Sequence, residues 1–195
     1  RSRPSPVAAD YEIVPIRVSS QGRSDLYLYE GPMPFRIVET APVEGAGGVR
    51  AVRMLGALTA QGMPPQALLL LSPDPLAEGD LTVLALDDSV AGFPPRHVRI
   101  VNLSGARVAG RIGDTEYATT ATQTTVPAIA VESSVSVGVA YERQGSPTVV
   151  FDQSIRVGES ERVLLVFLPP YRPGADVRVR VVRDSVPTSD TMEDS

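Results

Sequence analysis

The chain has 195 residues, of which 43% are hydrophobic and 21% charged, and its formal net charge is −5. This composition supports one large or two small folded domains, and it excludes wholesale disorder and the basic surface of a nucleic-acid-binding protein. The absence of cysteine excludes disulfides, zinc–thiolate sites and thiol catalysis. No apolar run reaches the roughly 18–20 residues needed to span a bilayer.

Short strands separated by turns that contain Pro or Gly are the predicted elements throughout. In chain order the first half predicts strands at Glu12–Val18, Asp25–Glu30, Pro34–Thr40, Val49–Met54, Gln66–Leu71 and Asp80–Leu86. The second half predicts strands at His97–Leu103, Arg107–Ile112, Thr124–Glu132, Ser134–Tyr141, Thr148–Phe151, Arg162–Leu168 and Asp176–Arg183. Alternation is clear at Val135, Val137 and Val139, as expected of a strand with one buried face. No amphipathic helix of three turns is predicted.

A segment near the middle of the chain is repeated near its end. Leu68–Val90 and Leu164–Val186 align without gaps at an offset of 96, with eight identities in 23 positions and a shared Asp-Ser-Val ending. Runs of apolar residues converge easily on Leu and Val, but they do not explain the shared Pro, Asp and Ser. We therefore predict an internal duplication.

The beginnings of the two copies match more weakly. Ile16-Arg17-Val18 resembles Val98-Arg99-Ile100 at an offset of 82, so the second copy carries about 14 additional residues in its middle. The predicted domains are 1–92 and 93–195, joined at a link stiffened by two successive prolines.

The predicted fold is all-β: two tandem immunoglobulin-like β-sandwich domains related by the duplication. Each copy should contain six or seven short strands and end in the same hairpin. The runs Leu68–Leu71 and Leu164–Phe167 predict buried central strands in these two hairpins, because they are apolar on both faces.

Three segments of the second half follow the pattern of a known family. Val98-Arg-Ile-Val-Asn-Leu-Ser104 matches an opening of the form V-R-hydrophobic-Val-His/Asn-x-Ser, and Val157–Val166 and Val177–Asp184 match two closing strands. In these segments the chain resembles a domain of unknown function found in secreted bacterial proteins. The resemblance covers about half of residues 97–186 and departs at Gly105–Arg107, where the family has a longer turn. It implies an extracytoplasmic, non-catalytic β-sandwich that is often present in tandem.

Residues able to carry chemistry form no recognisable catalytic pattern. His97 is the only histidine, and the chain has no G-x-S-x-G elbow that would make Ser104 a nucleophile. Asp87 and Asp88 are adjacent on a strand, so they point to opposite faces and cannot flank one glycosidic bond. We expect no enzyme, no catalytic residue and no cofactor; a hydrolase with a carboxylate site invisible in the sequence is the enzymatic alternative.

One acidic turn offers oxygen ligands. Asp74, Glu78 and Asp80 could hold Ca²⁺, but the equivalent turn of the second copy keeps only Asp176, and the EF-hand pattern is absent. A polar turn is the preferred interpretation, and no metal site is predicted.

The function expected from these features is that of a structural or protein-interaction module of the bacterial cell envelope or secreted fraction. A protein partner or a second copy of the chain is the expected ligand, and the first fifteen residues are the segment expected to contact it. Their apolar anchors are Val7, Tyr11, Ile13 and Val14.

A carbohydrate-binding module is the competing non-enzymatic interpretation. Sugar-binding surfaces use exposed aromatic rings, and the chain has no Trp. Tyr27 and Tyr29, on one face of a predicted strand, are the candidate sugar-binding pair.

Overall fold

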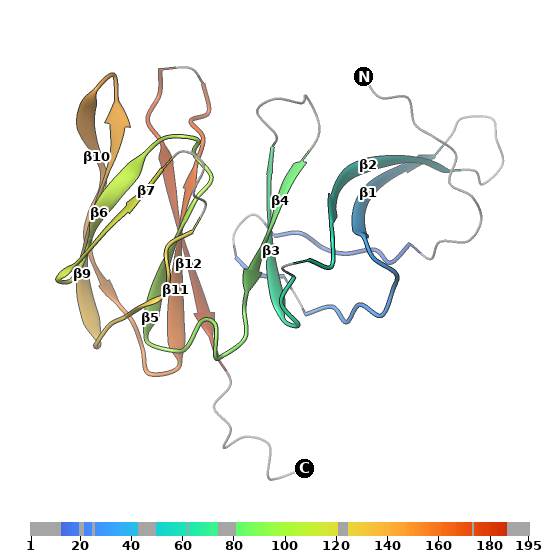
Figure 1. Cartoon of the computed structure of the whole chain (residues 1–195), viewed down its shortest axis with the longest axis horizontal. Helices are drawn as coiled ribbons and strands as arrows, with labels where there is room; N and C mark the ends of the chain where they lie inside the picture. The colour runs from blue at the N-terminus through green and yellow to red at the C-terminus, as the bar shows by residue number, and fades with distance from the viewer. Residues whose placement is uncertain are drawn as a thin grey trace, which may run out of the picture. The chain divides into compact units, whose positions relative to one another are not determined.

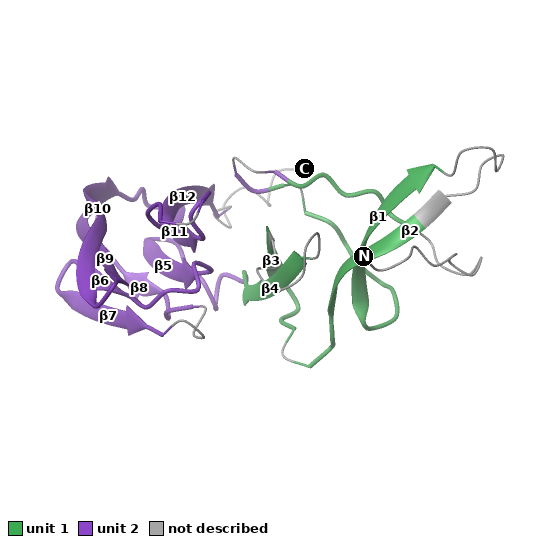
Figure 2. Ribbon diagram, turned by 90° about the horizontal axis from the view of Figure 1, so that it is seen from above, with its two compact units in different colours: residues 1–18, 24–88 green, residues 19–23, 89–195 purple. Residues whose placement is uncertain are grey.

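The structure is a computed structural model that describes residues 13–19, 22–24, 26–42, 50–61, 63–73, 81–120, 125–172 and 174–186. Across these residues the fold is all-β, with no helix, which confirms the predicted class. The chain divides into two compact units, coloured separately in Figure 2. Unit 1 comprises Arg1–Val18 and Ser24–Asp88, and unit 2 comprises Ser19–Arg23 and Ser89–Ser195.

Unit 2 is built from two four-stranded sheets (Figure 1). Its strands are β5 (His97–Asn102), β6 (Val108–Ile112), β7 (Thr115–Thr119), β8 (Ile129–Ala130), β9 (Ser134–Arg143), β10 (Ser146–Arg156), β11 (Glu161–Leu168) and β12 (Arg178–Ser185). One sheet has the order β10-β9-β6-β7 and is antiparallel throughout. The other has the order β12-β11-β5-β8, and in it β11 and β5 run parallel.

The core of unit 2 lies between the two sheets. Val98 and Ile100 of β5, Val137 and Val139 of β9, and Phe167 of β11 are each at most 1% exposed and belong to one apolar cluster. Branched aliphatic side chains dominate this cluster because they pack well on a pleated surface, and the sequence supplies no Trp. The alternation predicted along β9 is therefore confirmed.

β11 is buried on both faces. Every residue from Arg162 to Phe167 is at most 6% exposed, and the strand lies between β12 and β5. The prediction that Leu164–Phe167 forms a buried central strand is confirmed.

A buried asparagine joins the two sheets of unit 2. The Nδ2 of Asn102, at the end of β5, donates to the Ala106 carbonyl at 2.7 Å and to the Thr119 Oγ1 of β7 at 2.9 Å. Its Oδ1 accepts from the N–H and the hydroxyl of Ser104, at 3.1 and 2.6 Å. The Asn-x-Ser stretch in the opening motif thus has a structural role, because it holds the turn after β5 against the opposite sheet.

Two tight turns need backbone that glycine adopts easily. β9 and β10 are joined by Gln144 and Gly145, which both have positive φ, the pattern of a two-residue hairpin turn. β6 and β7 are joined by Gly113, also with positive φ, and Asp114.

Unit 1 contains two hairpins. β1 (Phe35–Pro42) pairs with β2 (Arg50–Leu58), and β3 (Ala67–Pro73) pairs with β4 (Leu81–Asp87). A Cβ at Gly56 of β2 would lie 2.5 Å from the Val83 Cγ2 of β4, so the glycine lets these two strands approach closely. Ile37 and Leu86 are the only hydrophobic side chains of unit 1, among those described, that are less than 9% exposed. Unit 1 is therefore much less completely packed than unit 2.

The last hairpins of the two units have the same register. In β3–β4, Ala67 pairs with Asp87 and Leu71 pairs with Val83. Adding 96 to every number gives pairs that are present in β11–β12: Val163 with Arg183, and Phe167 with Val179. The repeated sequence therefore forms a repeated hairpin, in which each strand residue keeps its partner.

Several predicted features of the first half are wrong. Within Glu12–Val18 and Asp25–Glu30, the described residues 13–18 and 26–30 belong to no strand, so unit 1 shows four strands instead of six or seven. Leu68–Leu71 is only half-buried, because β3 has a single hydrogen-bonded neighbour among the described residues. In the second half, β7 was not predicted, since its polar run Thr115-Glu116 masks the alternation that follows.

Replacing Asn102 with Ala tests the buried link between the sheets. Thr119 Oγ1 and the Ser104 groups would lose their buried partner, which typically costs about 1–3 kcal/mol. We expect the free energy of unfolding of the full chain, measured by urea denaturation, to fall by about this amount. Ser136→Ala, on the exposed face of β9, is the control, and a loss no larger than that of the control would contradict the assigned role.

Candidate functional site

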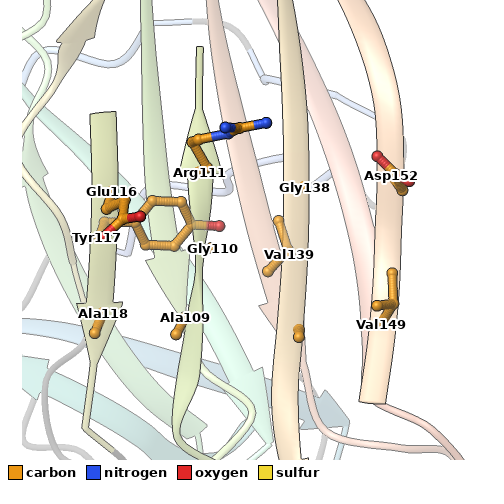
Figure 3. A pocket seen from close by; sticks show the side chains of 11 residues that line it. Ala109, Gly110, Arg111, Glu116, Tyr117, Ala118, Gly138, Val139, Val149 and Asp152 are labelled. Atoms are coloured by element: carbon orange, nitrogen blue, oxygen red, sulfur yellow. The ribbon is translucent and has the colours of Figure 1, made fainter. Parts of the chain in front are cut away.

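A shallow depression lies on the outer face of the β10-β9-β6-β7 sheet, lined by residues of all four strands (Figure 3). Its floor is a row of small side chains: Ala118 is paired with Ala109, Ala109 with Ala140, and Ala140 with Val149. Val149 closes the row as an exposed apolar side chain, 67% accessible. The depression is open to solvent.

Charged residues form the neighbouring row. Glu116 is paired with Arg111, Arg111 with Gly138, and Gly138 with Asp152. The two carboxylates stand on the outermost strands, three strand spacings apart, or roughly 14 Å. Glycosidases need carboxyl groups about 5–9.5 Å apart, so this row does not form a hydrolytic pair.

Beneath this depression a tyrosine hydroxyl is buried without a hydrogen-bond partner among the described residues. Tyr117 of β7 is 9% exposed and belongs to the core cluster. It pairs with Gly110 of β6, where a Cβ would clash with the Tyr117 hydroxyl and with the Gly138 carbonyl. The glycine therefore makes room for the ring. Burial raises the pKa of Tyr117 well above the ordinary tyrosine value of about 10.

A second tyrosine fastens the loop that precedes β12. The Tyr141 hydroxyl donates to Asp176 Oδ1 at 3.0 Å, and the Arg143 guanidinium donates to the same oxygen at 2.8 Å and to the Gly174 carbonyl. Burial, and then the hydrogen bond to Asp176, raise the pKa of Tyr141. Asp176 is the acid of this turn that both copies of the repeat retain, and here its role is structural.

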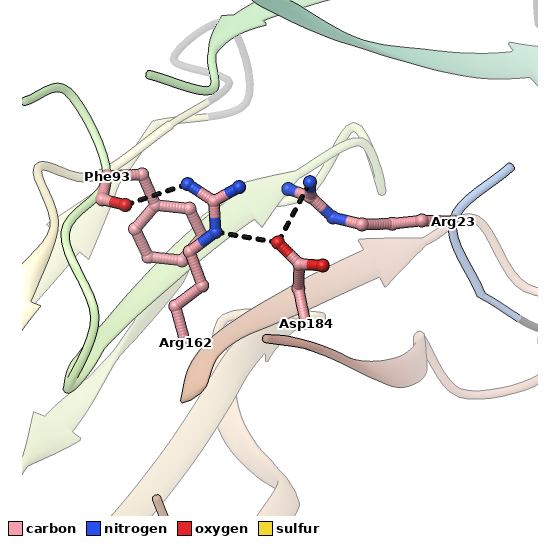
Figure 4. A network of polar contacts seen from close by, with 4 residues as sticks. All are labelled: Arg23, Phe93, Arg162 and Asp184. Carbon is pink, nitrogen blue, oxygen red and sulfur yellow. Dashed lines mark hydrogen bonds and ion pairs between the residues drawn. The ribbon is translucent and has the colours of Figure 1, made fainter. Parts of the chain in front are cut away.

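A polar network at the other sheet surrounds Phe93, which is 2% exposed (Figure 4). The guanidinium carbons of Arg99 and Arg162 lie 4.6 and 5.1 Å from the centre of its ring, within the range of cation–π attraction. Arg162 also donates to the Phe93 carbonyl at 2.8 Å, and Arg99 donates to the Gly92 carbonyl. The segment before β5 is thus bound to two buried arginines.

Asp184 of β12 completes this network. It accepts from the Nε of Arg162 at 2.8 Å, and Arg23 NH1 lies 3.0 Å from the same carboxylate oxygen. Arg23 lies in the stretch Ser19–Arg23, so this ion pair ties an early part of the chain to the last strand of unit 2. Every cation in the network has a partner that holds it in place, which is the pattern of a structural cluster.

The predicted partner-binding anchors lie partly within the described residues. Ile13 and Val14 are 44% and 61% exposed, on an extended stretch that continues to Val18. Val7 and Tyr11 lie outside the described residues. Ile13 and Val14 are therefore accessible to a partner, and the prediction that they contact one stays a prediction.

The predicted sugar-binding pair lies on a similar extended stretch. Tyr27 and Tyr29 are 40% and 42% exposed. The Tyr27 hydroxyl accepts the Arg17 N–H at 3.0 Å, and the Tyr29 hydroxyl donates to the Pro32 carbonyl at 2.5 Å. The ring of Tyr29 also packs edge-on against Phe35. Both tyrosines are thus engaged with their own unit.

Two leucines that alternate with these tyrosines are the residues that the sequence interpretation missed. Leu26 and Leu28 are 84% and 87% exposed. Alternation along the sequence places Leu26 and Leu28 on the face opposite Tyr27 and Tyr29. It does not show that the leucines would be exposed.

The remaining candidates for chemistry are dispersed. His97 Nδ1 donates to the Pro95 carbonyl at 2.8 Å. Asp87, the last residue of β4, is exposed, and Asp88, just after the strand, is buried. The turn with Asp74, Glu78 and Asp80 lies outside the described residues. Within the described ranges, no three His, Cys, Asp or Glu side chains gather as a metal site.

Comparison with protein-family models, with curated proteins and with solved structures gives no match. The described residues contain no helix that is long and apolar enough to cross a membrane. The function is therefore argued from the surfaces of the chain itself.

Substitutions in the Phe93 network should show that Arg162 contributes more to stability than Arg23. Arg162→Ala leaves Asp184 and the Phe93 carbonyl without their buried donor, and such losses cost about 3–5 kcal/mol. Arg23→Ala leaves the bond between Arg162 and Asp184 in place, so we expect it to cost less than Arg162→Ala. Urea unfolding of both variants measures the difference, and equal losses would contradict this hierarchy.

The buried tyrosine predicts a loss of stability in alkali. Because the folded state raises the pKa of Tyr117, its contribution is constant below pH 10 and is lost as the pH rises above about 10, where the unfolded chain ionises first. Tyrosinate absorbance should show a late-titrating tyrosine that Tyr117→Phe removes. The same variant should be more stable at neutral pH by about 1–3 kcal/mol, because it removes an unsatisfied buried hydroxyl. A loss of stability at neutral pH would show that the hydroxyl has a partner.

Proposed function

We propose that this protein is a non-catalytic structural or protein-interaction module and acts as a subunit of an assembly. The observation that carries the proposal is the exposed apolar surface of unit 1. Extended residues without a sheet partner present Ile13, Val14, Ile16 and Val18, each 40–63% exposed, and Leu26 and Leu28 are more than 80% exposed. Apolar side chains this exposed, close together along two short stretches of chain, suit an interaction site.

The same stretches suit recognition by β-strand addition. The described residues 13–18 and 26–30 belong to no helix or strand and join no ladder. Pairing with a partner strand would satisfy their backbone groups, and their alternating side chains would supply specificity.

Carbohydrate binding has less support. A sugar platform needs a free aromatic face and polar groups that reach the ligand, but the hydroxyls of Tyr27 and Tyr29 already bond to their own backbone. The exposed leucines beside them offer a sugar no hydrogen bonds. These contacts favour a protein partner at this surface.

Catalysis also has less support than binding. The one histidine is bonded to a backbone carbonyl, and the outer-face carboxylates of unit 2 lie too far apart to act on one bond. A location in the bacterial cell envelope or secreted fraction is part of the proposal, and it rests on the resemblance of Val98–Ser104 and the closing strands to secreted domains.

Light scattering on the full chain, and on a chain lacking residues 1–15, tests this function. We expect the full chain to exceed the monomer mass of 20.7 kDa, and the shortened chain to fall to it. The double substitution Leu26→Ser and Leu28→Ser should weaken the assembly, whereas Ser136→Ala on β9 should not. A monomer in every case, with glycan binding that Tyr27→Ala abolishes, would overturn the proposal in favour of a carbohydrate-binding module.

A further inference from the structure

We infer that the free edge of β3 is a strand-binding slot, and that its occupant is the segment Val14–Val18 of a second copy of this chain. This inference rests on the proposed function and deepens it, because it names both surfaces of the contact. β3 and β11 occupy equivalent places in the repeated hairpin, and they differ in how many of their edges are paired.

The two hairpins are equivalent residue by residue. Every pair from Ala67–Asp87 to Ser72–Thr82 recurs in β11–β12 when 96 is added to both numbers. Because the register is the same, each face and each edge of β3 corresponds to the same face and edge of β11.

β11 uses both of its edges, whereas β3 uses one. On the edge away from β12, β11 pairs in parallel with β5, from Val163 opposite Val98 to Phe167 opposite Asn102. The corresponding edge of β3 has no strand partner within the described residues. The consequence is visible in burial: Leu164–Phe167 is fully buried, and Leu68–Leu71 only half-buried.

The sequence contains an equivalent of β5 at the start of unit 1. Ile16-Arg17-Val18 matches Val98-Arg99-Ile100 at an offset of 82. In β5 the two apolar residues are completely buried, while Ile16 and Val18 are 40% and 63% exposed. The segment that would fill the slot is thus present in the chain, and its described residues belong to no sheet.

The register of this missing pair follows from unit 2. Applying the two offsets to the β5–β11 pairs places Ile16 opposite Ala67, Arg17 opposite Leu68, and Val18 opposite Leu69. Ile16, Val18 and Val14 would then share the core face of β3, since alternate residues share a face. Arg17 would lie on the opposite face of the strand from these three residues, as Arg99 does in β5.

Among the described residues, the segment does not pair with β3 of its own copy. The Arg17 N–H, which lies in the middle of the predicted strand, donates instead to the Tyr27 hydroxyl at 3.0 Å. No backbone hydrogen bond joins the described residues 13–18 to β3. Reciprocal exchange between two copies fills both slots with the matching strand, and such swapping is a low-cost route to a symmetric dimer.

Engineered disulfides test both the slot and its occupant, because the native chain has no cysteine. Paired residues on neighbouring strands lie at about 5 Å, within the Cα separation of about 4.4–6.8 Å that a disulfide needs. Full-length Val18→Cys and isotope-labelled Leu69→Cys are unfolded together, refolded as a mixture and oxidised with glutathione disulfide. Non-reducing electrophoresis and peptide mass spectrometry then identify linked residues.

We expect a dimer in which residue 18 of one copy is linked to residue 69 of the other, at a yield at least tenfold above the control mixture of Arg17→Cys with Leu69→Cys. The control shifts the cysteine by one residue and thereby turns it to the opposite face. Ile16→Cys with Ala67→Cys provides a second pair in the same register, so that a folding defect in one variant does not decide the result.

Two outcomes would overturn the inference. A yield no higher than that of the control, for both pairs, would show that the slot does not take this segment. A bridge that forms only within monomers of the double variant Val18→Cys, Leu69→Cys would show that the chain fills its own slot. If the mass still falls on removal of residues 1–15 while no bridge forms, the proposed assembly stands and only this contact is rejected.

Discussion

A strand that is apolar on both faces must be covered on both faces and paired at both edges, and this requirement governs the molecule. β11 meets it, because β12 and β5 flank it and every residue from Arg162 to Phe167 is buried. The parallel pairing of β11 with β5 brings the beginning of unit 2 beside its end. The core valines of both sheets, the Asn102 bonds and the Phe93 network are then arranged around this central pair.

Unit 1 shows what happens when the same requirement is met only in part. β3 has the four leucines and the register of the equivalent hairpin, but within the described part of the chain it has one partner strand, and few of the surrounding apolar side chains are buried. The hydrophobic effect favours covering such a surface with whatever complementary chain is available. Under the proposed function, the accessible apolar residues of unit 1 would contact the partner, and the well-packed unit 2 would support them.

The all-β class and the hairpin repeat could be predicted because both can be read directly from the order of residues. Alternation along Val135–Val139 indicates a strand, and identities at a fixed offset indicate the repeat. It did not predict that Glu12–Val18 and Asp25–Glu30 would lack partners, since pairing depends on chain segments distant in sequence. The Phe93 network was missed for the same reason. Arg162 and Asp184 are 22 residues apart, and only the register of β11 with β12 shows that they lie opposite each other. The exposure of Leu26 and Leu28 is likewise a property of the tertiary structure.

The ion pair between Arg23 and Asp184 changes what counts as a domain in this chain. A boundary drawn between residues 92 and 93 would assign Arg23 to the first half, yet its carboxylate partner is on the last strand. The two units are interleaved along the chain, and a fragment that begins at Ser89 lacks one of its own parts. A cut near the midpoint of the chain therefore separates Arg23 from Asp184, although the two form an ion pair within unit 2.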